Sequence, residues 1–213
     1  MTQTKVLLMV GGNSTYHNFE EIGNILKNTV EESKCDVFLT ENLDMFLPSN
    51  IKEFDIILTY TIERTLTKEQ EDGLLNAIIG APSEIKGRTK GFIGLHGATI
   101  SFIDSIRYLR MIGGKLLAHP PTDTFLFQVS NPSHPIMEGI TNFSLKDELY
   151  LTEIFTPIES LLICQYNGFN HPIAWIKPYG LGKVFYCSLG HGKEQMSNKN
   201  TQTIIKNAIE WMK

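Results

Sequence analysis

The segment Gly91–Ala98, with the sequence GFIGLHGA, is the feature that most constrains the fold of this chain. A strand is expected from Lys90 to Leu95, because the residues after Lys90 form a continuous apolar run, as in a buried parallel strand. The run ends in Gly94–Ala98, where glycines stand on both sides of one polar residue. This pattern is typical of a sharp strand-to-helix turn that lifts one side chain above the end of a parallel sheet. The lifted residue is His96, which indicates an active site and argues against simple acyl-enzyme chemistry.

The N-terminal half alternates apolar runs with amphipathic stretches. Strands are expected at Lys5–Val10, Cys35–Thr40, Phe54–Tyr60 and Lys90–Leu95. Apolar residues at helical spacing from Phe19 to Val30 predict one helix, and a capping box from Thr67 to Gln70 predicts the start of another. A loop is expected over Gly80–Gly87 and a further helix over Phe102–Ile112. This alternation predicts a mostly parallel sheet with helices on both faces.

The C-terminal half, after Gly113 and Gly114, has shorter segments separated by prolines and glycines. Strands are expected at Lys115–Ala118, Thr124–Val129, Leu161–Gln165, Ile173–Ile176 and Val184–Leu189. A turn over Pro178–Gly182 joins the last two strands, so part of this half is antiparallel. Apolar residues between Ile204 and Met212 predict a closing helix. With 213 residues, 42% of them hydrophobic, we expect a single domain over residues 1–213.

Charge and composition limit the classes of partner. The chain has 19 basic and 23 acidic residues and no basic run, so binding to nucleic acid or to an anionic membrane surface is not supported. No apolar run approaches the roughly 20 residues of a membrane span, and Met1–Val10 is too short for a signal-peptide core. The cysteines Cys35, Cys164 and Cys187 are widely spaced, which fits a reducing cytoplasm rather than a disulfide framework.

Four of the six histidines follow predicted strands. They are His17, His96, His119 and His191. Because ligands of open parallel sheets bind at the carboxyl ends of the strands, we expect these side chains to converge. Histidine is suited both to proton transfer near neutral pH and to metal ligation. The other two, His134 and His171, are interpreted as structural or surface residues.

Two carboxylates and a phenol stand together in Lys146–Tyr150, between two structured regions. Alternation predicts that either Asp147 or Glu148 points into the site while the other faces solvent, and the sequence leaves open which one does. Neither Cys164 nor Cys187 is expected to be a nucleophile, because both lie inside apolar strands.

Several motifs occur in the order found in the ThuA-like (trehalose utilisation) family, which the chain resembles over nearly its whole length. They are Tyr16-His17, Gly91–Ala98, Gly113–Pro120, His134–Ile136 with Gly139, Asp147–Tyr150, Pro172–Trp175, Gly182–His191 and Ile209–Trp211. The resemblance implies a flavodoxin-like, doubly wound sheet with an antiparallel extension, as in class I glutamine amidotransferases. Those enzymes carry cysteine at the elbow, so His96 argues against glutaminase chemistry. The resemblance further implies a role in carbohydrate metabolism, classically disaccharide utilisation with keto-sugar intermediates.

The first functional hypothesis is an enzyme that acts on a small sugar or sugar derivative. His96, His191 and Glu148 would do acid–base work such as proton abstraction, isomerisation or bond cleavage. A divalent metal such as zinc could assist, with His17, His96, Glu148 and His191 as ligands. Residues expected to bind the substrate are His17, His119, Asp147 and Tyr150. No nucleotide cofactor is expected.

The second hypothesis is a non-catalytic sugar-binding or oligomerisation module, and the chain could form a homo-oligomer. In that case Tyr16, Tyr150 or Trp175 could stack on a sugar ring, although an aromatic residue in such a strand is more often part of the core. The four histidines favour the enzyme, because binding alone does not require so many titratable groups. A third reading, a cysteine-dependent amidotransferase, would require Cys164 or Cys187 at the elbow.

Overall fold

The computed structural model describes residues 3–80 and 90–213, and its largest element is a nine-stranded mixed sheet. Its strands are β1 (Lys5–Gly12), β2 (Asp36–Thr40), β3 (Ile56–Ile62), β4 (Gly91–Leu95), β6 (Asp123–Val129), β7 (Phe143–Asp147), β9 (Glu159–Tyr166), β10 (Phe169–Tyr179) and β11 (Gly182–Cys187). Their order is β2-β1-β3-β4-β11-β10-β9-β6-β7. The first five are parallel to one another, and every later pairing is antiparallel. The predicted parallel sheet with an antiparallel extension is therefore confirmed.

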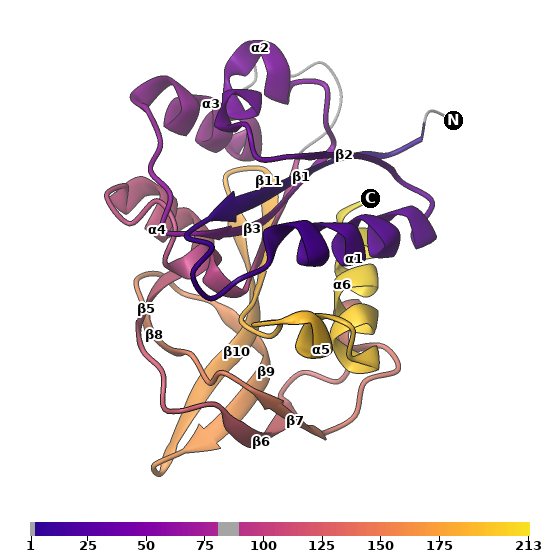
Figure 1. Ribbon diagram of the computed structural model, residues 1–213, viewed down its shortest axis with the longest axis vertical. Coiled ribbons are helices and arrows are strands. Elements are labelled where there is room, and N and C mark those ends of the chain that lie inside the picture. The colour runs from indigo at the N-terminus through magenta and orange to yellow at the C-terminus, as the bar shows by residue number, and fades with distance from the viewer. Residues whose placement is uncertain (1–2, 81–89) are drawn as a thin grey trace.

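A short antiparallel ribbon and the helices surround this sheet (Figure 1). The ribbon pairs β5 (Gly114–Ala118) with β8 (Leu151–Ile154). The α-helices are α1 (Phe19–Glu32), α2 (Pro48–Ile51), α3 (Lys68–Ile79), α4 (Ile106–Ile112), α5 (Lys193–Met196) and α6 (Lys199–Met212), and the 3-10 turns are η1 (Leu43–Phe46), η2 (His96–Thr99) and η3 (Pro135–Met137). None of the described helices is long and apolar enough to cross a membrane.

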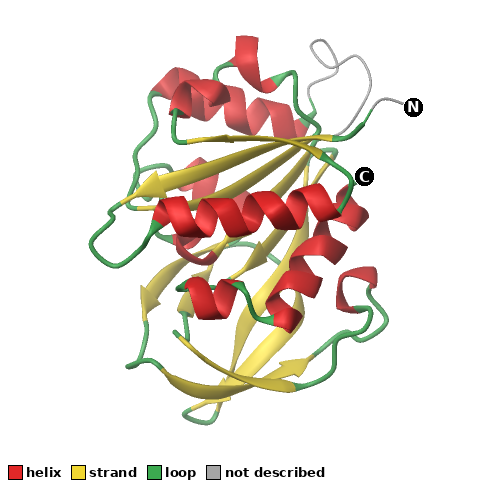
Figure 2. Ribbon diagram, turned by 45° about the vertical axis from the view of Figure 1, so that its right-hand side comes forward, coloured by secondary structure: helices red, strands yellow, loops and turns green. Residues whose placement is uncertain are grey.

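The parallel half has three layers, because its strands are apolar on both faces. In β1, Val6 and Leu8 belong to the hydrophobic cluster that contains α1 and α6, whereas Leu7 and Met9 belong to the cluster that contains α3 and α4. Successive side chains of a strand point to opposite faces, so one continuous apolar run serves two cores. Figure 2 shows α1 and α6 side by side on one face of the sheet.

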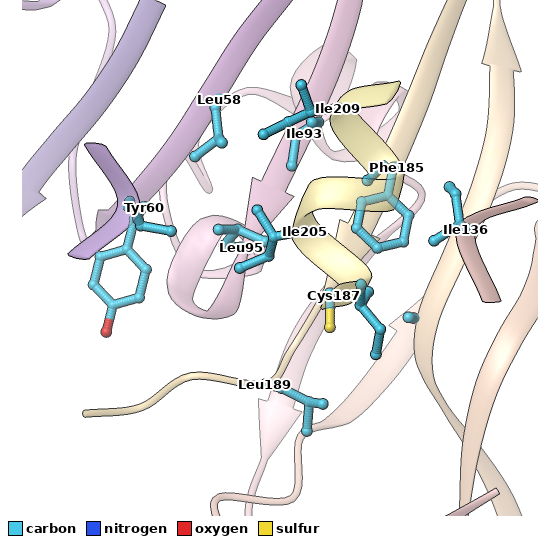
Figure 3. Close-up of a cluster of buried hydrophobic side chains, with 14 of the residues drawn as sticks. Leu58, Tyr60, Ile93, Leu95, Ile136, Phe185, Cys187, Leu189, Ile205 and Ile209 are labelled. Atoms are coloured by element: carbon cyan, nitrogen blue, oxygen red, sulfur yellow. The ribbon is translucent and has the colours of Figure 1, made fainter. Parts of the chain in front are cut away.

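The core beneath α6 confirms the predicted closing helix. In Figure 3, Ile205 and Ile209 of α6 project toward Ile93 and Leu95 of β4, the strand that leads to the elbow. All four side chains are fully buried. This packing fixes the end of β4 relative to the sheet, and therefore fixes the position of the residue that follows it.

Two predicted helix boundaries were tested by the structure. The capping box is confirmed, since the side chains of Thr67 and Gln70 each accept from the other's backbone N–H and α3 follows. The helix expected over Phe102–Ile112 is shorter and begins at Ile106, because the side chain of Ser105 accepts from the N–H of Tyr108 and caps it there.

The remaining differences from the sequence prediction concern strands and one loop. The strand expected at Phe54–Tyr60 lies two residues further on, as β3. The turn between β10 and β11 is confirmed, but β7 and β8 were not predicted. Both are short and carry exposed positions, so they lack the continuous apolar run of the central strands. The loop expected over Gly80–Gly87 lies, from residue 81 onward, outside the described residues.

Candidate functional site

His96 occupies the turn at the end of β4 in a strained backbone conformation. Its φ of 45° lies in the left-handed region, which a residue other than glycine adopts only at a cost. The glycine beside it is required by packing, because a Cβ on Gly97 would lie 2.2 Å from Cγ1 of Ile62. The turn continues directly into η2 rather than into an α-helix. The elbow predicted from the sequence is therefore present, with a histidine as its raised residue.

The hydrogen bonds of His96 determine which ring nitrogen carries the proton. Its side chain is fully buried, and Nδ1 lies 2.9 Å from the carbonyl oxygen of Ser188. Because a carbonyl can only accept, Nδ1 is the protonated nitrogen and Nε2 is left with a free lone pair. The hydroxyl of Tyr150 donates to that Nε2 at 3.0 Å. His96 thus presents an unprotonated nitrogen to the site.

His17 is held in the same way in the loop after β1. Its Nδ1 donates to the carbonyl oxygen of His191 at 3.1 Å, which leaves Nε2 unprotonated. The hydroxyl of Tyr60 donates to the carbonyl oxygens of Gly190 and His191, at 3.1 and 3.0 Å, and so fixes the same backbone. The loop approaches β3 closely, because a Cβ on Gly12 would lie 1.8 Å from the carbonyl oxygen of Ile62.

Asp147 anchors the backbone that carries His191. The Asp147 carboxylate is fully buried and accepts from the N–H of Gly190 at 2.8 Å and from that of His191 at 3.3 Å. It also accepts from the N–H of Glu148 at 2.8 Å. Burial raises the pKa of Asp147 to about 6, although these backbone donors favour the charged form. Asp147 therefore connects the end of β7 with the loop after β11.

Three histidines meet at the carboxyl ends of the parallel strands, and we call them the histidine cluster. They are His17, His96 and His191. Each offers one ring nitrogen, and these nitrogens all lie within 4.8 Å of one another. Glu148 borders the cluster: its Oε2 lies 3.7 Å from Nε2 of His96 and 3.2 Å from Nδ1 of His191, and its Oε1 lies 4.0 Å from Nδ1 of His119. The Nδ1 of His191 makes an ion-pair contact with Glu148 rather than an aligned hydrogen bond.

The environment keeps two of these histidines neutral and favours charge on the third. Burial lowers the pKa of His96 to about 3, and burial together with the neighbouring His191 lowers the pKa of His17. The contact with Glu148 raises the pKa of His191. Burial opposes ionisation of Glu148, but the surrounding histidines outweigh it and lower its pKa. The environment therefore favours the neutral form of His17 and His96, and it favours the charged forms of His191 and Glu148.

The cluster opens into a cavity of about 430 Å³, a volume within the roughly 300–1,000 Å³ of small-molecule sites. We call it the histidine cavity. It is lined by Asn13, Tyr16, His17, Ile62, Glu63, Ile100, Leu116, His119, Glu148, Tyr150 and His191. The cavity therefore contains three of the four histidines that follow predicted strands, and the fourth, His96, lies directly behind Tyr150 and Glu148.

The other predicted site residues are placed as follows. His119 follows β5, which belongs to the ribbon rather than to the large sheet, yet it reaches the cavity. Glu148 lines the cavity while Asp147 is buried behind it, so neither faces open solvent, contrary to the predicted alternation. Trp175 is a core residue whose indole N–H donates to the carbonyl oxygen of Ile112, and it does not reach the cavity.

Two polar residues of the cavity lining, and a tyrosine that lies behind it, were missed by the sequence analysis. Asn13 and Glu63 line the wall beside His17, and the Tyr60 hydroxyl contacts Nδ1 of His17 from behind. The signal that could have found Glu63 is its position, because it follows β3 directly and the rule applied to the histidines applies equally to it. His134 and His171 lie outside the cavity lining, in agreement with their interpretation as structural or surface residues.

The fold and the site together define a flavodoxin-like α/β protein with a histidine cluster at its strand ends. The chain belongs to the ThuA family, described as trehalose utilisation, whose model matches residues 5–212. This description supports an association with carbohydrate metabolism. No curated protein matches the sequence.

Solved structures share the fold at low sequence identity. A ThuA-like protein from Bacteroides uniformis is 17% identical, with a TM-score of 0.76 over 98% of this chain and 91% of that chain. A ThuA-like protein from Parabacteroides merdae is 16% identical, with a TM-score of 0.83 over 99% and 90%. A β-galactosidase from Bacillus circulans is 10% identical, with a TM-score of 0.66, and the match covers 98% of this chain and 31% of that one. At these identities the likeness concerns the fold alone.

Proposed function

We propose that this chain is an enzyme that modifies a sugar or sugar derivative, with the histidine cluster as its catalytic centre. The observation that carries the proposal is the matched orientation of His17 and His96. Each donates Nδ1–H to a backbone carbonyl and keeps its Nε2 unprotonated, while burial lowers both pKa values. A buried imidazole with a fixed tautomer is prepared to accept a proton or a metal ion.

The donor set fits a divalent ion such as zinc. Zinc in catalytic sites takes three protein ligands from histidine and carboxylate side chains and leaves one position open. His17, His96 and His191 would supply three nitrogens, and Glu148 lies at the edge of the cluster beside the position left open. The backbone carbonyls that accept from His17 and His96 are the outer partners that ligating histidines usually have. When bound, such an ion would polarise a substrate oxygen.

We assign the residues around the cluster to proton transfer, substrate contact and the positioning of His191. Glu148 is the group that would take up and return a proton, since its carboxylate borders the cluster and lies 3.2 Å from Nδ1 of His191. His119 and Tyr150 line the cavity, which supports their assignment as substrate-contacting residues. Asp147, expected to bind substrate, is buried, and we assign it the positioning of His191 instead. A keto sugar suits this arrangement, because proton abstraction next to a carbonyl needs a base and a polarised oxygen.

Metal analysis of the purified protein tests the centre. We expect about one equivalent of zinc per chain after incubation with zinc and removal of the excess, and loss of that zinc in His17→Ala. The matched control is His171→Ala, which removes a part-buried histidine of β10 outside the cavity. Absence of stoichiometric metal in the wild type would remove the metal-assisted form. Unchanged turnover of a keto sugar by His96→Ala would remove the catalytic assignment altogether.

The second candidate is a non-catalytic sugar-binding or oligomerisation module. It is favoured by one observation, that the same fold forms about a third of the β-galactosidase chain. Both proposals include a cytoplasmic location and the formation of a homo-oligomer. Sugar binding that persists in His96→Ala, together with no turnover in the wild type, would support the module. Loss of a measurable turnover in that variant would support the enzyme.

A further inference from the structure

A polar pair that the histidine chemistry does not use lies in the wall of the histidine cavity. The side-chain amide of Asn13 donates to Oε2 of Glu63 at 2.7 Å, and both side chains are exposed. Asn13 is fixed on its other sides, because its N–H donates to the carbonyl oxygen of Ile62 and its Oδ1 accepts from the N–H of Thr15. The pair is thus held rigidly at the junction of the loop after β1 with the end of β3.

The pair keeps free hydrogen-bonding capacity. The Asn13 amide has a second N–H, and among residues 3–80 and 90–213 no group donates to Oε1 of Glu63. A donor and an acceptor therefore stand side by side in the cavity wall. Two neighbouring hydroxyls of a sugar match this pattern, since one can donate to the carboxylate while the other accepts from the amide.

The backbone of Glu63 has a strained conformation at the point where its side chain enters the cavity wall. Its φ is 53°, in the left-handed region that glutamate rarely adopts. The next residue, Arg64, turns away from the cavity and donates to the carbonyl oxygens of Val10 and Glu41. The carbonyl of Arg64 accepts from the N–H of Phe102. Hydrogen bonds to separate segments of the chain therefore hold the backbone at Glu63 and Arg64 in place. Strain of this kind persists where the surrounding structure enforces it, often at binding sites.

The charge of the cavity restricts what can occupy it. Two of its lining residues, Glu63 and Glu148, are carboxylates, and none of the lining residues that the structure describes is lysine or arginine. His191 is already paired with Glu148 at 3.2 Å, and His17 donates its Nδ1–H to the carbonyl oxygen of His191. A phosphate or carboxylate group on the ligand would meet these two carboxylates without a lysine or arginine side chain to offset its charge.

We propose that Asn13 and Glu63 form a hydroxyl-binding subsite that selects neutral polyols over phosphorylated or acidic sugars. The inference rests on the proposed function, because it assumes that the histidine cavity takes a sugar. It adds to that function the residues that hold the hydroxyls and the class of substrate. Tyr16, which is 76% exposed and also lines the cavity, is placed to cover one face of the bound ring.

Sugar binding to the full-length protein tests the subsite. Binding of glucose, trehalose and glucose 6-phosphate is measured by titration calorimetry or saturation-transfer NMR, after chelator treatment so that no bound metal attracts the phosphate. We expect at least one neutral sugar to bind, and glucose 6-phosphate to bind more weakly than glucose. Glu63→Gln preserves the shape of the side chain and should weaken the neutral sugar about tenfold, because a hydrogen bond to a charged acceptor becomes neutral.

Glu69→Gln is the matched control, since Glu69 is an exposed glutamate in the first turn of α3 and does not line the cavity. It should leave sugar binding unchanged. Any one of three results would overturn the subsite. The neutral sugar could bind equally well to the wild type and to Glu63→Gln, glucose 6-phosphate could bind to the wild type more tightly than glucose, or neither neutral sugar could bind to the wild type. Zinc uptake is measured in parallel. If the wild type takes up no zinc, the result counts against the metal centre only. Glu63→Gln should take up zinc like the wild type.

Discussion

The hydroxyl of Tyr150 donates to Nε2 of His96 across 3.0 Å, in a contact from which solvent is excluded. This is the nitrogen that would bind a metal ion, because Nδ1 of His96 is committed to the carbonyl oxygen of Ser188. Tyr150 and a metal therefore compete for one lone pair. In the structure the phenol of Tyr150 occupies this lone pair. Metal binding therefore requires the hydroxyl to turn toward another acceptor, and Glu148 is a nearby one.

Removing that competitor should strengthen metal binding. In Tyr150→Phe, the Nε2 of His96 is left without its donor, so zinc no longer has to displace a hydrogen bond with a net value of about 1 kcal/mol. We expect zinc affinity, measured by competition with a chromogenic chelator, to rise severalfold. Tyr16→Phe is the control, since Tyr16 is exposed and no hydrogen bond joins its hydroxyl to a histidine among the described residues. Weaker zinc binding in Tyr150→Phe would show that the phenol supports the metal rather than competing with it.

His96 should make the stability of the fold dependent on pH. Its pKa is about 3 in the folded state because of burial, against about 6.5 in an unfolded chain. Between these values the unfolded state binds a proton that the folded state does not, so stability falls as pH decreases from 6.5 toward 3. The slope contributed by one proton is up to about 1.4 kcal/mol per pH unit.

The measurement is the free energy of unfolding by urea at several pH values between 7 and 4. His96→Asn should show a shallower dependence than the wild type, and His171→Gln should retain the wild-type slope. The pKa of His17 is lowered in the same direction, so part of the dependence will remain in His96→Asn. An unchanged slope in that variant would contradict the assignment.

The elbow should not tolerate a side chain at Gly97. A Cβ there would lie 2.2 Å from Cγ1 of Ile62 and 2.9 Å from the carbonyl oxygen of Thr61, so the backbone of β3 would have to shift. We expect Gly97→Ala to lower the free energy of unfolding by about 1–3 kcal/mol. Gly192→Ala should change it by less than about 0.5 kcal/mol, because the nearest atom, Oε1 of Gln195, is the end of a flexible side chain. Urea denaturation of the two variants makes the comparison, and equal stabilities would refute the prediction.

Asp147 should act through the backbone that it holds. In Asp147→Asn, the buried carboxylate that accepts from the N–H groups of Gly190 and His191 becomes a neutral amide. We expect a loss of about 2–3 kcal/mol in stability and weaker zinc binding, because His191 is no longer fixed. Asp123→Asn is a close control, since Asp123 is the exposed strand partner of Asp147 in β6. Zinc affinity that stays at the wild-type value in Asp147→Asn would show that Asp147 is structural only.

Local chain chemistry was sufficient to predict much of the parallel half. The apolar runs that became β1 and β4, and the reciprocal bonds of Thr67 and Gln70, depend on neighbours in the sequence. The strands β7 and β8 escaped prediction because their residues are half exposed, and their pairing is decided by distant partners. Similarly, the helix expected from Phe102 begins only at Ile106, because Phe102 adopts a left-handed φ of 54° while its N–H donates to the carbonyl oxygen of the distant Arg64. Ser105 then caps the helix.

The sequence by itself determined that His17, His96 and His191 follow strands of a parallel sheet, and hence that they share one edge of it. Only the tertiary structure decided the rest. The tautomers of His17 and His96 depend on carbonyl groups about 90 or more residues away, and the inward turn of both Asp147 and Glu148 depends on the loop at Gly190. Hydrogen bonds between distant segments exist only once the chain has folded, so they leave no periodic signal in the sequence.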